Sequence, residues 1–442
     1  MNSITCSAHK TFEDYKDQKA CYRFLSNENV KESILIEQIR RKCASSVSNK
    51  NVIAICDTSV INTDSHWGRI SDHEGLGSTG RNQKKASHGF FVHPITVFAS
   101  DSDAAYGLAD IHVYNREMTP TNLNRVERNR ESSKLPIEQK ETYKWVGPCE
   151  KAKQTSLKSA KHITFLMDRE GDIWDVYRRL PDERTDIIVR CKHDRCIINS
   201  KGKQTKLFSE LQAQKPNEIF EITIKNKNKK NRKLLVEMKI GHSQIVPSHK
   251  NSSTELIKLS YVEITQIPRK NETLEDPVHW ILWTNKPINS TAEGKTIIKT
   301  YQKRWRIEVF FKLIKSDGFD IENTQLESGR AIRKLTIIIM DAAMKILQLK
   351  AARAGDTDLR VDQMFTEKEI ECLKSLNKRL DGNTAKQQNP HPIKNLAWAS
   401  WIIARLAGWT EFYDDKRPPG NKTFKRGLDR FESIMIGYDL SG

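Results

Sequence analysis

The stretch that decides the fold is YQKRWRIEVFFKLIK, residues 301–315. Just before it, Ser290 is followed three residues later by Glu293, a spacing typical of the capping box that starts a helix. No proline interrupts the chain between Ser290 and Lys315. The sequence therefore predicts one helix from about Ser290 to about Lys315.

Four polar residues of this helix fall on one stripe. At about 100° per residue, positions seven apart return to within about 20° of one another, so the stripe holds Tyr301, Arg304, Glu308 and Lys315. The other faces are largely apolar, which predicts burial on more than one side. A buried carboxylate has to be paired or bind a metal. Glu308 is therefore either half of an ion pair with Arg304, four residues earlier, or a metal ligand, and both interpretations stay open from the helix alone.

The charge of the whole chain indicates an anionic partner. The 442 residues include 74 Lys and Arg against 56 Asp and Glu, a formal net charge of +18. Contacts from Lys and Arg to phosphates are the main sequence-independent source of nucleic-acid affinity. The composition therefore favours a polyanion such as DNA.

Neither the apolar segments nor the cysteines indicate a membrane or secreted protein. The run Thr336–Leu349 is interrupted by polar residues and is typical of an amphipathic core helix, and the first residues lack the apolar region of a signal peptide. The eight cysteines lack the dense spacing of a disulfide scaffold. We expect a soluble cytoplasmic protein with reduced thiols and no membrane partner.

Two short apolar runs that predict buried strands each end on an aspartate. Residues 52–56 (VIAIC) precede Asp57, and residues 162–167 (HITFLM) precede Asp168. An acid in that position lies where a strand leaves its sheet. Two such aspartates and a glutamate on a buried helix supply the oxygen ligands of a two-metal phosphoryl-transfer site, in which the ions are roughly 4 Å apart. Asp57, Asp168 and Glu308 are the predicted ligands.

The rest of the chain divides into strand-rich and helix-rich parts. Consecutive strands near the first aspartate suggest an antiparallel meander, and helices are expected before residue 50 and after residue 350. The basic connector 225–233 is either a solvated turn or a DNA contact. Further strands are predicted at 89–98, 106–114, 182–191, 219–224, 234–240, 257–264 and 279–283, and a short helix at 172–180.

Asp57 in AICDTS, Asp168 in MDREGDIWD and the pattern Tyr301-x2-Arg304-x3-Glu308-x6-Lys315 together resemble a known family. The resemblance is to the DDE transposases of bacterial cut-and-paste insertion sequences, specifically the Tn-five-like, IS-four-type group with its YREK signature. It implies an α/β fold with an RNase H-like catalytic core, a β-rich insertion before the catalytic-Glu helix, and helical N- and C-terminal regions. The implied divisions are a helical region at 1–50, the core at 51–204 and 288–350, the insertion at 205–287, and a helical region for possible dimerisation at 351–442.

The same resemblance implies roles for individual residues. Asp57, Asp168 and Glu308 would be catalytic and would hold two Mg2+ ions, with Mn2+ as a substitute. Trp280 would stack on a flipped base near the cleavage point, a task that needs an aromatic platform; a core strand position is the alternative, and Trp283 is its rival. The residues expected to contact DNA are Tyr301, Arg304, Lys312, Lys315, Trp280, Arg190 and Lys192.

The implied function is cut-and-paste transposition by strand nicking, hairpin formation and strand transfer. The partners would be the terminal inverted repeats of the element and target DNA, bound by a homodimer in the synaptic complex on the cytoplasmic nucleoid. Because the region before the first strand is shorter than in relatives, one alternative is an N-terminally truncated, non-cleaving inhibitor that binds DNA or dimerises. A second alternative is an RNase H-like nuclease. Inverted repeats and target duplications beside the gene would favour transposition.

Overall fold

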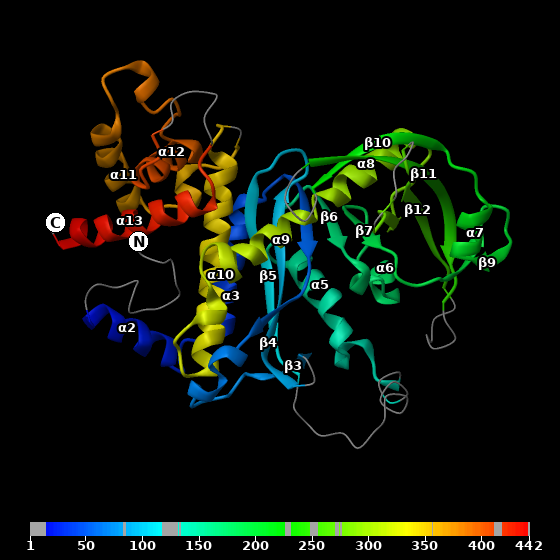
Figure 1. Cartoon of the computed structure of the whole chain (residues 1–442), viewed down its shortest axis with the longest axis horizontal. Coiled ribbons are helices and arrows are strands. Elements are labelled where there is room, and N and C mark those ends of the chain that lie inside the picture. The colour runs from blue at the N-terminus through cyan, green and yellow to red at the C-terminus, as the bar shows by residue number, and fades with distance from the viewer. Residues whose placement is uncertain are drawn as a thin grey trace.

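A mixed β-sheet with helices around it forms the framework of the protein (Figure 1). The computed structural model describes residues 15–82, 85–116, 131, 134–225, 231–247, 255–269, 274, 276–355, 357–410 and 418–440. The strands are β1 (Asn51–Cys56), β2 (Ser59–Asn62), β3 (Gly77–Asn82), β4 (Lys85–Ala99), β5 (Ala105–Tyr114), β6 (His162–Met167), β7 (Thr185–Arg190), β8 (Cys196–Asn199), β9 (Gln204–Lys206), β10 (Glu218–Lys225), β11 (Asn231–Ile245), β12 (Ile257–Gln266) and β13 (His279–Thr284).

The centre of the sheet consists of parallel strands buried on both faces. Along the sheet the strand order is β2-β4-β1-β6-β7-β13-β12-β11-β8-β9, with β3 and β5 paired to β4 and β10 paired to β11. Strand β1 runs parallel to β6, and β6 runs parallel to β7. All residues of β1 and β6 except the first of each are buried, which is expected for parallel strands covered by helices.

The predicted antiparallel strands before the second aspartate are confirmed. Strand β4 pairs antiparallel with both β1 and β5. Strands β2 and β3, which lie in the polar Gly- and Ser-rich segment after Asp57, were not predicted, because that segment lacks the apolar alternation of a strand. In the second half of the chain, the strands predicted between residues 219 and 283 correspond to β10, β11, β12 and β13, and they continue the same sheet.

Helices lie around the sheet, and Figure 1 shows those of the C-terminal region together at the left of the view. The long helix α10 packs on α3 and β5 and also contacts α12 and α13. The helices are α2 (Tyr15–Ser26), α3 (Glu32–Ser46), α5 (Gly147–Gln154), α6 (Trp174–Arg179), α7 (Leu207–Ala213), α8 (Thr291–Gln302), α9 (Trp305–Lys312), α10 (Gly329–Ala352), α11 (Glu367–Leu380), α12 (Leu396–Leu406) and α13 (Asn421–Leu440).

The prediction of one helix from Ser290 to Lys315 is wrong in one respect. The capping box at Ser290 and Glu293 is present and starts α8. Helix α8 then ends at Gln302, a turn at Lys303 and Arg304 separates it from α9, and α9 continues into a π-helical segment, Leu313–Asp317. The backbone at Lys303 and Arg304 keeps right-handed helical angles. The break is therefore a local change of hydrogen bonding, without the Gly or Pro that would mark it in sequence.

Candidate active site

Asp57 and Asp168 lie side by side at the ends of two neighbouring strands. Asp57 follows the last residue of β1 and Asp168 follows the last residue of β6, and these last residues, Cys56 and Met167, are partners in the parallel register. Each carboxylate also accepts a hydrogen bond from the backbone amide of the next residue, at 2.8 Å in both cases. The strand pairing thus brings together two acids that lie more than a hundred residues apart in the chain.

Arg304 joins both aspartates to Glu308. Its Nη1 lies 2.8 Å from Oδ2 of Asp57, and its Nη2 lies 3.3 Å from Oε1 of Glu308 and 3.6 Å from Oδ2 of Asp168. The Arg304 side chain is only 12% exposed. The structure therefore contains both features that were considered for Glu308, namely the ion pair within the helix and the meeting of three acidic side chains.

Tyr301 and Arg190 contact the same aspartate from other directions. The Tyr301 hydroxyl donates a hydrogen bond to Oδ1 of Asp168 at 3.2 Å, and Nη1 of Arg190 lies 3.7 Å from that oxygen. The Tyr301 ring packs edge to face on Trp280, with ring centroids 5.5 Å apart. Trp283 is completely buried and cannot present its ring to a ligand, whereas Trp280 is partly exposed.

Burial at this site changes the pKa of Asp57 and of Tyr301. Burial, reinforced by the neighbouring Glu308 and Asp168 carboxylates, raises the pKa of Asp57 to about 6, against the opposing pull of Arg304 and the Thr58 amide. Burial and the Asp168 carboxylate also raise the pKa of the Tyr301 hydroxyl, which stays protonated and able to donate. Asp57 therefore ionises less readily here than in water.

The two lysines of this segment that were predicted to bind DNA form ion pairs with acids outside the site. The Nζ of Lys312 lies 2.8 Å from Asp317, and the Nζ of Lys315 lies 3.2 Å from Glu322. The carboxylate of Glu322 also accepts a hydrogen bond from the backbone amide of Asn62 at the end of β2. The π-helical segment therefore directs Lys315 toward β2, so the stripe predicted for an ideal helix does not extend to this residue.

The comparison with known protein families concerns the part of the chain that contains most of this site. Residues 131–344, just under half of the chain, match the family model described as Transposase DDE domain. This part of the chain is therefore similar to the domain of DDE transposases. This class of enzyme depends on metal ions and cleaves DNA, so at that level the predictions of a transposase, of a metal and of DNA as partner are confirmed. Asp57 lies outside the matched residues, but β1 places it beside Asp168.

A metal at this site would have to bind among Asp57, Asp168 and Glu308. Across the described ranges, no three His, Cys, Asp or Glu side chains are positioned to hold one ion together. Arg304 instead lies among Asp57, Asp168 and Glu308. The donors are all carboxylate oxygens, which hard divalent cations prefer, and three negative charges exceed the one positive charge of the guanidinium. The residues fit a divalent ion provided that the Arg304 side chain moves aside.

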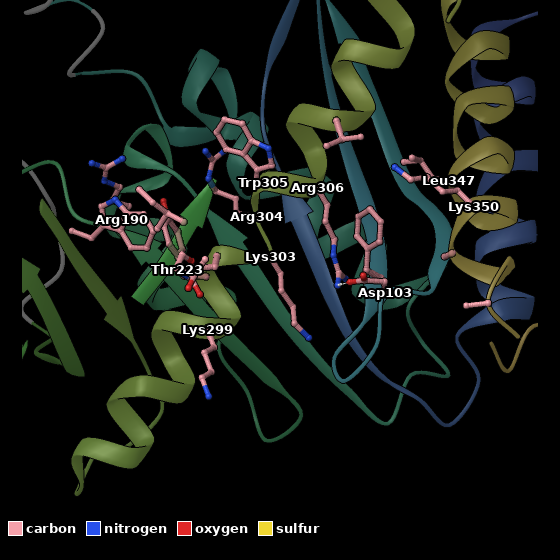
Figure 2. Close-up of a pocket in the computed structure, with 18 of the residues that line it drawn as sticks. Asp103, Arg190, Thr223, Lys299, Lys303, Arg304, Trp305, Arg306, Leu347 and Lys350 are labelled. Carbon is pink, nitrogen blue, oxygen red and sulfur yellow. Dashed lines mark hydrogen bonds and ion pairs between the residues drawn. The ribbon is translucent and has the colours of Figure 1, made fainter. Parts of the chain in front are cut away.

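A basic cleft of about 840 Å3 lies next to these acids. Arg190, Trp280, Tyr301 and Arg304 line it, whereas the three carboxylates do not. Figure 2 shows Arg190 at one end of the cleft, Arg304 and Trp305 near its centre, and Lys350 of α10 at the other end. Other basic residues that line it are Lys299, Lys303, Arg306 and Arg353.

Two residues of this region were missed by the sequence analysis. Trp305, the first residue of α9, is 44% exposed and lines the cleft. Its position directly after Arg304 was visible, but the single-helix prediction gave no reason to expect an exposed tryptophan. Asp172 was seen only as the start of a predicted helix, whereas it is a buried hydrogen-bond acceptor. Lys192, which was predicted to contact DNA, is exposed and follows β7.

Among the described residues, none of the helices combines the length and the apolar composition needed to span a bilayer. The loop 225–233 falls largely on residues 226–230, which lie outside the described ranges, so its role remains a prediction.

Proposed function

We propose that the chain is a cut-and-paste DNA transposase of the Tn-five-like, IS-four-type group, with Tyr301, Arg304, Glu308 and Lys315 as its YREK residues. Asp57, Asp168 and Glu308 would hold two Mg2+ ions, with Mn2+ as a substitute. The observation that supports this proposal is the meeting of these three carboxylates at one guanidinium, with Nη-to-oxygen distances of 2.8–3.6 Å.

Arg304 has two roles in this proposal. In the metal-free protein it neutralises part of the charge on the three carboxylates, which would otherwise repel one another. When DNA binds, the planar guanidinium of Arg304 would release these carboxylates and bind a phosphate of the transposon end. Phosphate and carboxylate both accept two parallel hydrogen bonds from a guanidinium. Tyr301 and Arg190, which contact Asp168, would turn to the same phosphates.

The chemistry consists of sequential phosphoryl transfers. When bound, the divalent ions would activate the attacking oxygen and stabilise the charge that develops on the phosphate. Hydrolysis breaks the bond between phosphorus and the 3′-oxygen at the element end, which leaves a 3′-hydroxyl. That hydroxyl then attacks the opposite strand to form a hairpin, and after the hairpin opens it attacks target DNA. Trp280, beside Tyr301 in the cleft, would stack on the base displaced during hairpin formation.

The proposed partners follow from the same assignment. The net charge of +18 and the basic residues that line the cleft suit the terminal inverted repeats and the target DNA. Synapsis of two element ends calls for a homodimer on DNA, with the helical region 351–442 as the candidate contact. The protein would act on the nucleoid. In this proposal, residues 51–204 and 288–350 form the RNase H-like core, and residues 205–287 form the insertion.

The decisive experiment is a cleavage assay with a labelled duplex that carries the inverted repeat found beside the gene. With Mg2+, the wild-type protein should nick the element end, and Asp57→Ala, Asp168→Ala and Glu308→Ala should each abolish cleavage while DNA binding persists. Asp103→Ala is the matched control, because Asp103 is an acid of the same cleft that pairs with Arg306, away from the three carboxylates. It should keep near-normal cleavage.

The outcomes also distinguish the alternatives. DNA binding without cleavage by the wild-type protein would support a non-cleaving inhibitor. Cleavage of any duplex, with no preference for the repeat and no strand joining, would support an RNase H-like nuclease. Wild-type cleavage rates in any of the three alanine variants would remove that residue from the proposed ligand set.

A further inference from the structure

Asp172 is a carboxylate with no exposed side-chain surface, four residues after Asp168. Its Oδ1 accepts hydrogen bonds from the Tyr177 hydroxyl at 2.7 Å and from Nε of Arg195 at 2.9 Å. Its Oδ2 accepts hydrogen bonds from the backbone amides of Lys192 at 2.7 Å and His193 at 2.9 Å. Every polar group that these contacts bring to the carboxylate is a donor.

On one side, Asp172 ends the turn that carries Asp168. The residues between them form a single 3-10 turn, Arg169–Gly171, which the Asp168 side chain caps at Arg169 and which closes with a hydrogen bond of 2.8 Å from the Gly171 amide to the Asp168 carbonyl. The turn packs tightly on β6, since a Cβ atom at Gly171 would lie 2.7 Å from the Cβ of Met167. Fixing Asp172 therefore leaves Asp168 little freedom to shift.

On the other side, Asp172 holds the segment that follows β7. Arg190, the last residue of β7, faces Asp168 at 3.7 Å and also donates a hydrogen bond to the His279 carbonyl on β13. The next residues turn sharply, and the amides of Lys192 and His193 both donate to Asp172. The buried carboxylate thus sets the point from which the exposed Lys192 side chain leaves the surface.

The charge of Asp172 is retained despite its burial. Burial opposes its ionisation, but Arg195 and the two backbone amides outweigh that effect and hold the pKa of Asp172 below its ordinary range. Arg195 also lies over the Tyr177 ring, 5.3 Å from its centroid. An ionised carboxylate with all its lone pairs occupied makes a rigid connection between two loops, because loss of either set of donors would leave a buried charge unpaired.

We propose that Asp172 is a positioning residue that holds the Asp168 turn and the end of β7 at a fixed separation. Through it, the metal-binding carboxylate and the cations Arg190 and Lys192 would act on the same stretch of DNA backbone. This inference rests on the proposed function, in which Asp168 binds metal and these cations contact phosphates.

The test is Asp172→Asn, which keeps the shape of the side chain but replaces one acceptor oxygen by a donor. Because all the contacting groups are donors, the NH2 group of Asn must face either the backbone amides or Arg195, and that contact cannot be a hydrogen bond. The matched control is Asp110→Asn. Asp110 is also a buried acid, with 5% side-chain exposure, and it pairs with Arg40 at 2.6 Å on the opposite side of the sheet centre, at β5 and α3. Both variants should lower the unfolding temperature.

DNA binding separates positioning from general destabilisation. Binding of a labelled random-sequence duplex is measured over a range of salt concentrations, because the slope of log affinity against log salt changes by about 0.9 for each phosphate that the protein ceases to neutralise. Asp172→Asn should flatten this slope by about 1–2, and Lys192→Ala and Arg190→Ala should each flatten it by about 1. The Asp172→Asn, Lys192→Ala double variant should be no flatter than the Asp172→Asn variant. Asp110→Asn should leave the slope unchanged.

Metal binding gives the second measurement. Titration of the DNA-free protein with Mn2+, followed by electron paramagnetic resonance, should show an affinity about tenfold lower in Asp172→Asn, the usual size of the effect when support for a metal ligand is removed. Asp110→Asn should bind Mn2+ as the wild type does.

The failures are distinguishable. If Asp172→Asn changes only the unfolding temperature, as Asp110→Asn does, while Lys192→Ala still flattens the salt slope, the positioning role is overturned and the proposed function stands. If the wild-type protein binds no Mn2+ and cleaves no repeat DNA, the proposed function fails and this inference fails with it.

Discussion

Replacement of Asp57 by Asn should stabilise the metal-free protein. The Asp57 side chain is 22% exposed, and burial together with Glu308 and Asp168 raises its pKa to about 6. In the unfolded chain an aspartate has a pKa of about 3.9. Its ionised form is therefore less favourable in the folded protein than in the unfolded one, and this cost grows as the pH rises from about 4 to about 6 and is complete above that.

The size of the effect follows from the displaced pKa. Each pH unit between the folded and unfolded pKa values corresponds to about 1.4 kcal/mol, so ionised Asp57 costs the metal-free protein up to about 3 kcal/mol at about pH 8. Cooperative unfolding of 442 residues, with an entropy of about 2.1 cal/mol/K per residue, converts this into a rise of about 3 °C in the unfolding midpoint of Asp57→Asn. The gain should shrink as the pH falls below 6 and vanish below about pH 4.

The assay is differential scanning calorimetry of both proteins across this pH range, with EDTA and then with excess Mg2+. In EDTA at neutral pH, Asp57→Asn should have a higher unfolding midpoint than the wild type. Addition of Mg2+ should raise the midpoint of the wild type more than that of the variant, because an ion that binds only the folded state stabilises it. Asp64→Asn is the control of opposite sign: although burial opposes it, donors from Ser87 and His88 hold the pKa of Asp64 low, so its loss should destabilise at neutral pH. A pH-independent difference, or a destabilised Asp57→Asn in EDTA, would refute the reasoning.

Three further outcomes are expected. Arg304→Ala should raise the Mn2+ affinity of the DNA-free protein by about tenfold, roughly the effect of removing one competing charge-assisted hydrogen bond; an unchanged or weaker affinity in a Mn2+ titration would contradict this. Lys315→Ala should reduce the salt slope of duplex binding by about 1, whereas Glu322→Gln, which removes the partner of Lys315, should tighten binding at low salt. Trp280→Ala should slow hairpin formation while nicking is largely kept, measured on denaturing gels; equal loss of both steps would indicate a structural tryptophan.

The strands and their terminal acids could be predicted because burial leaves a local signature. Parallel strands covered on both faces are continuous apolar runs, so β1 and β6 were recognisable, and an acid at the end of such a run has to lie at the edge of the sheet. The pairing of β1 with β6 was not predictable. It joins segments separated by β4 and β5, and strand order depends on contacts that no local pattern records.

The details of the site depended on geometry that the sequence does not display. The turn at Arg304 and the π-helical segment around Lys315 contain no Gly or Pro, so an unbroken helix was the natural expectation. That expectation placed Lys315 on the stripe of Glu308, whereas the π-helical segment directs it to Glu322. Asp172 was missed because its acceptor role depends on the loop after β7, about twenty residues later.

The most direct measurement is the anomalous scattering of Mn2+ in crystals of the protein bound to its element-end DNA. We expect manganese peaks within bonding distance of carboxylate oxygens from Asp57, Asp168 and Glu308, with the Arg304 guanidinium moved from these acids to a DNA phosphate. Manganese bound elsewhere, or Arg304 still in contact with all three carboxylates while the DNA is cut, would contradict the account.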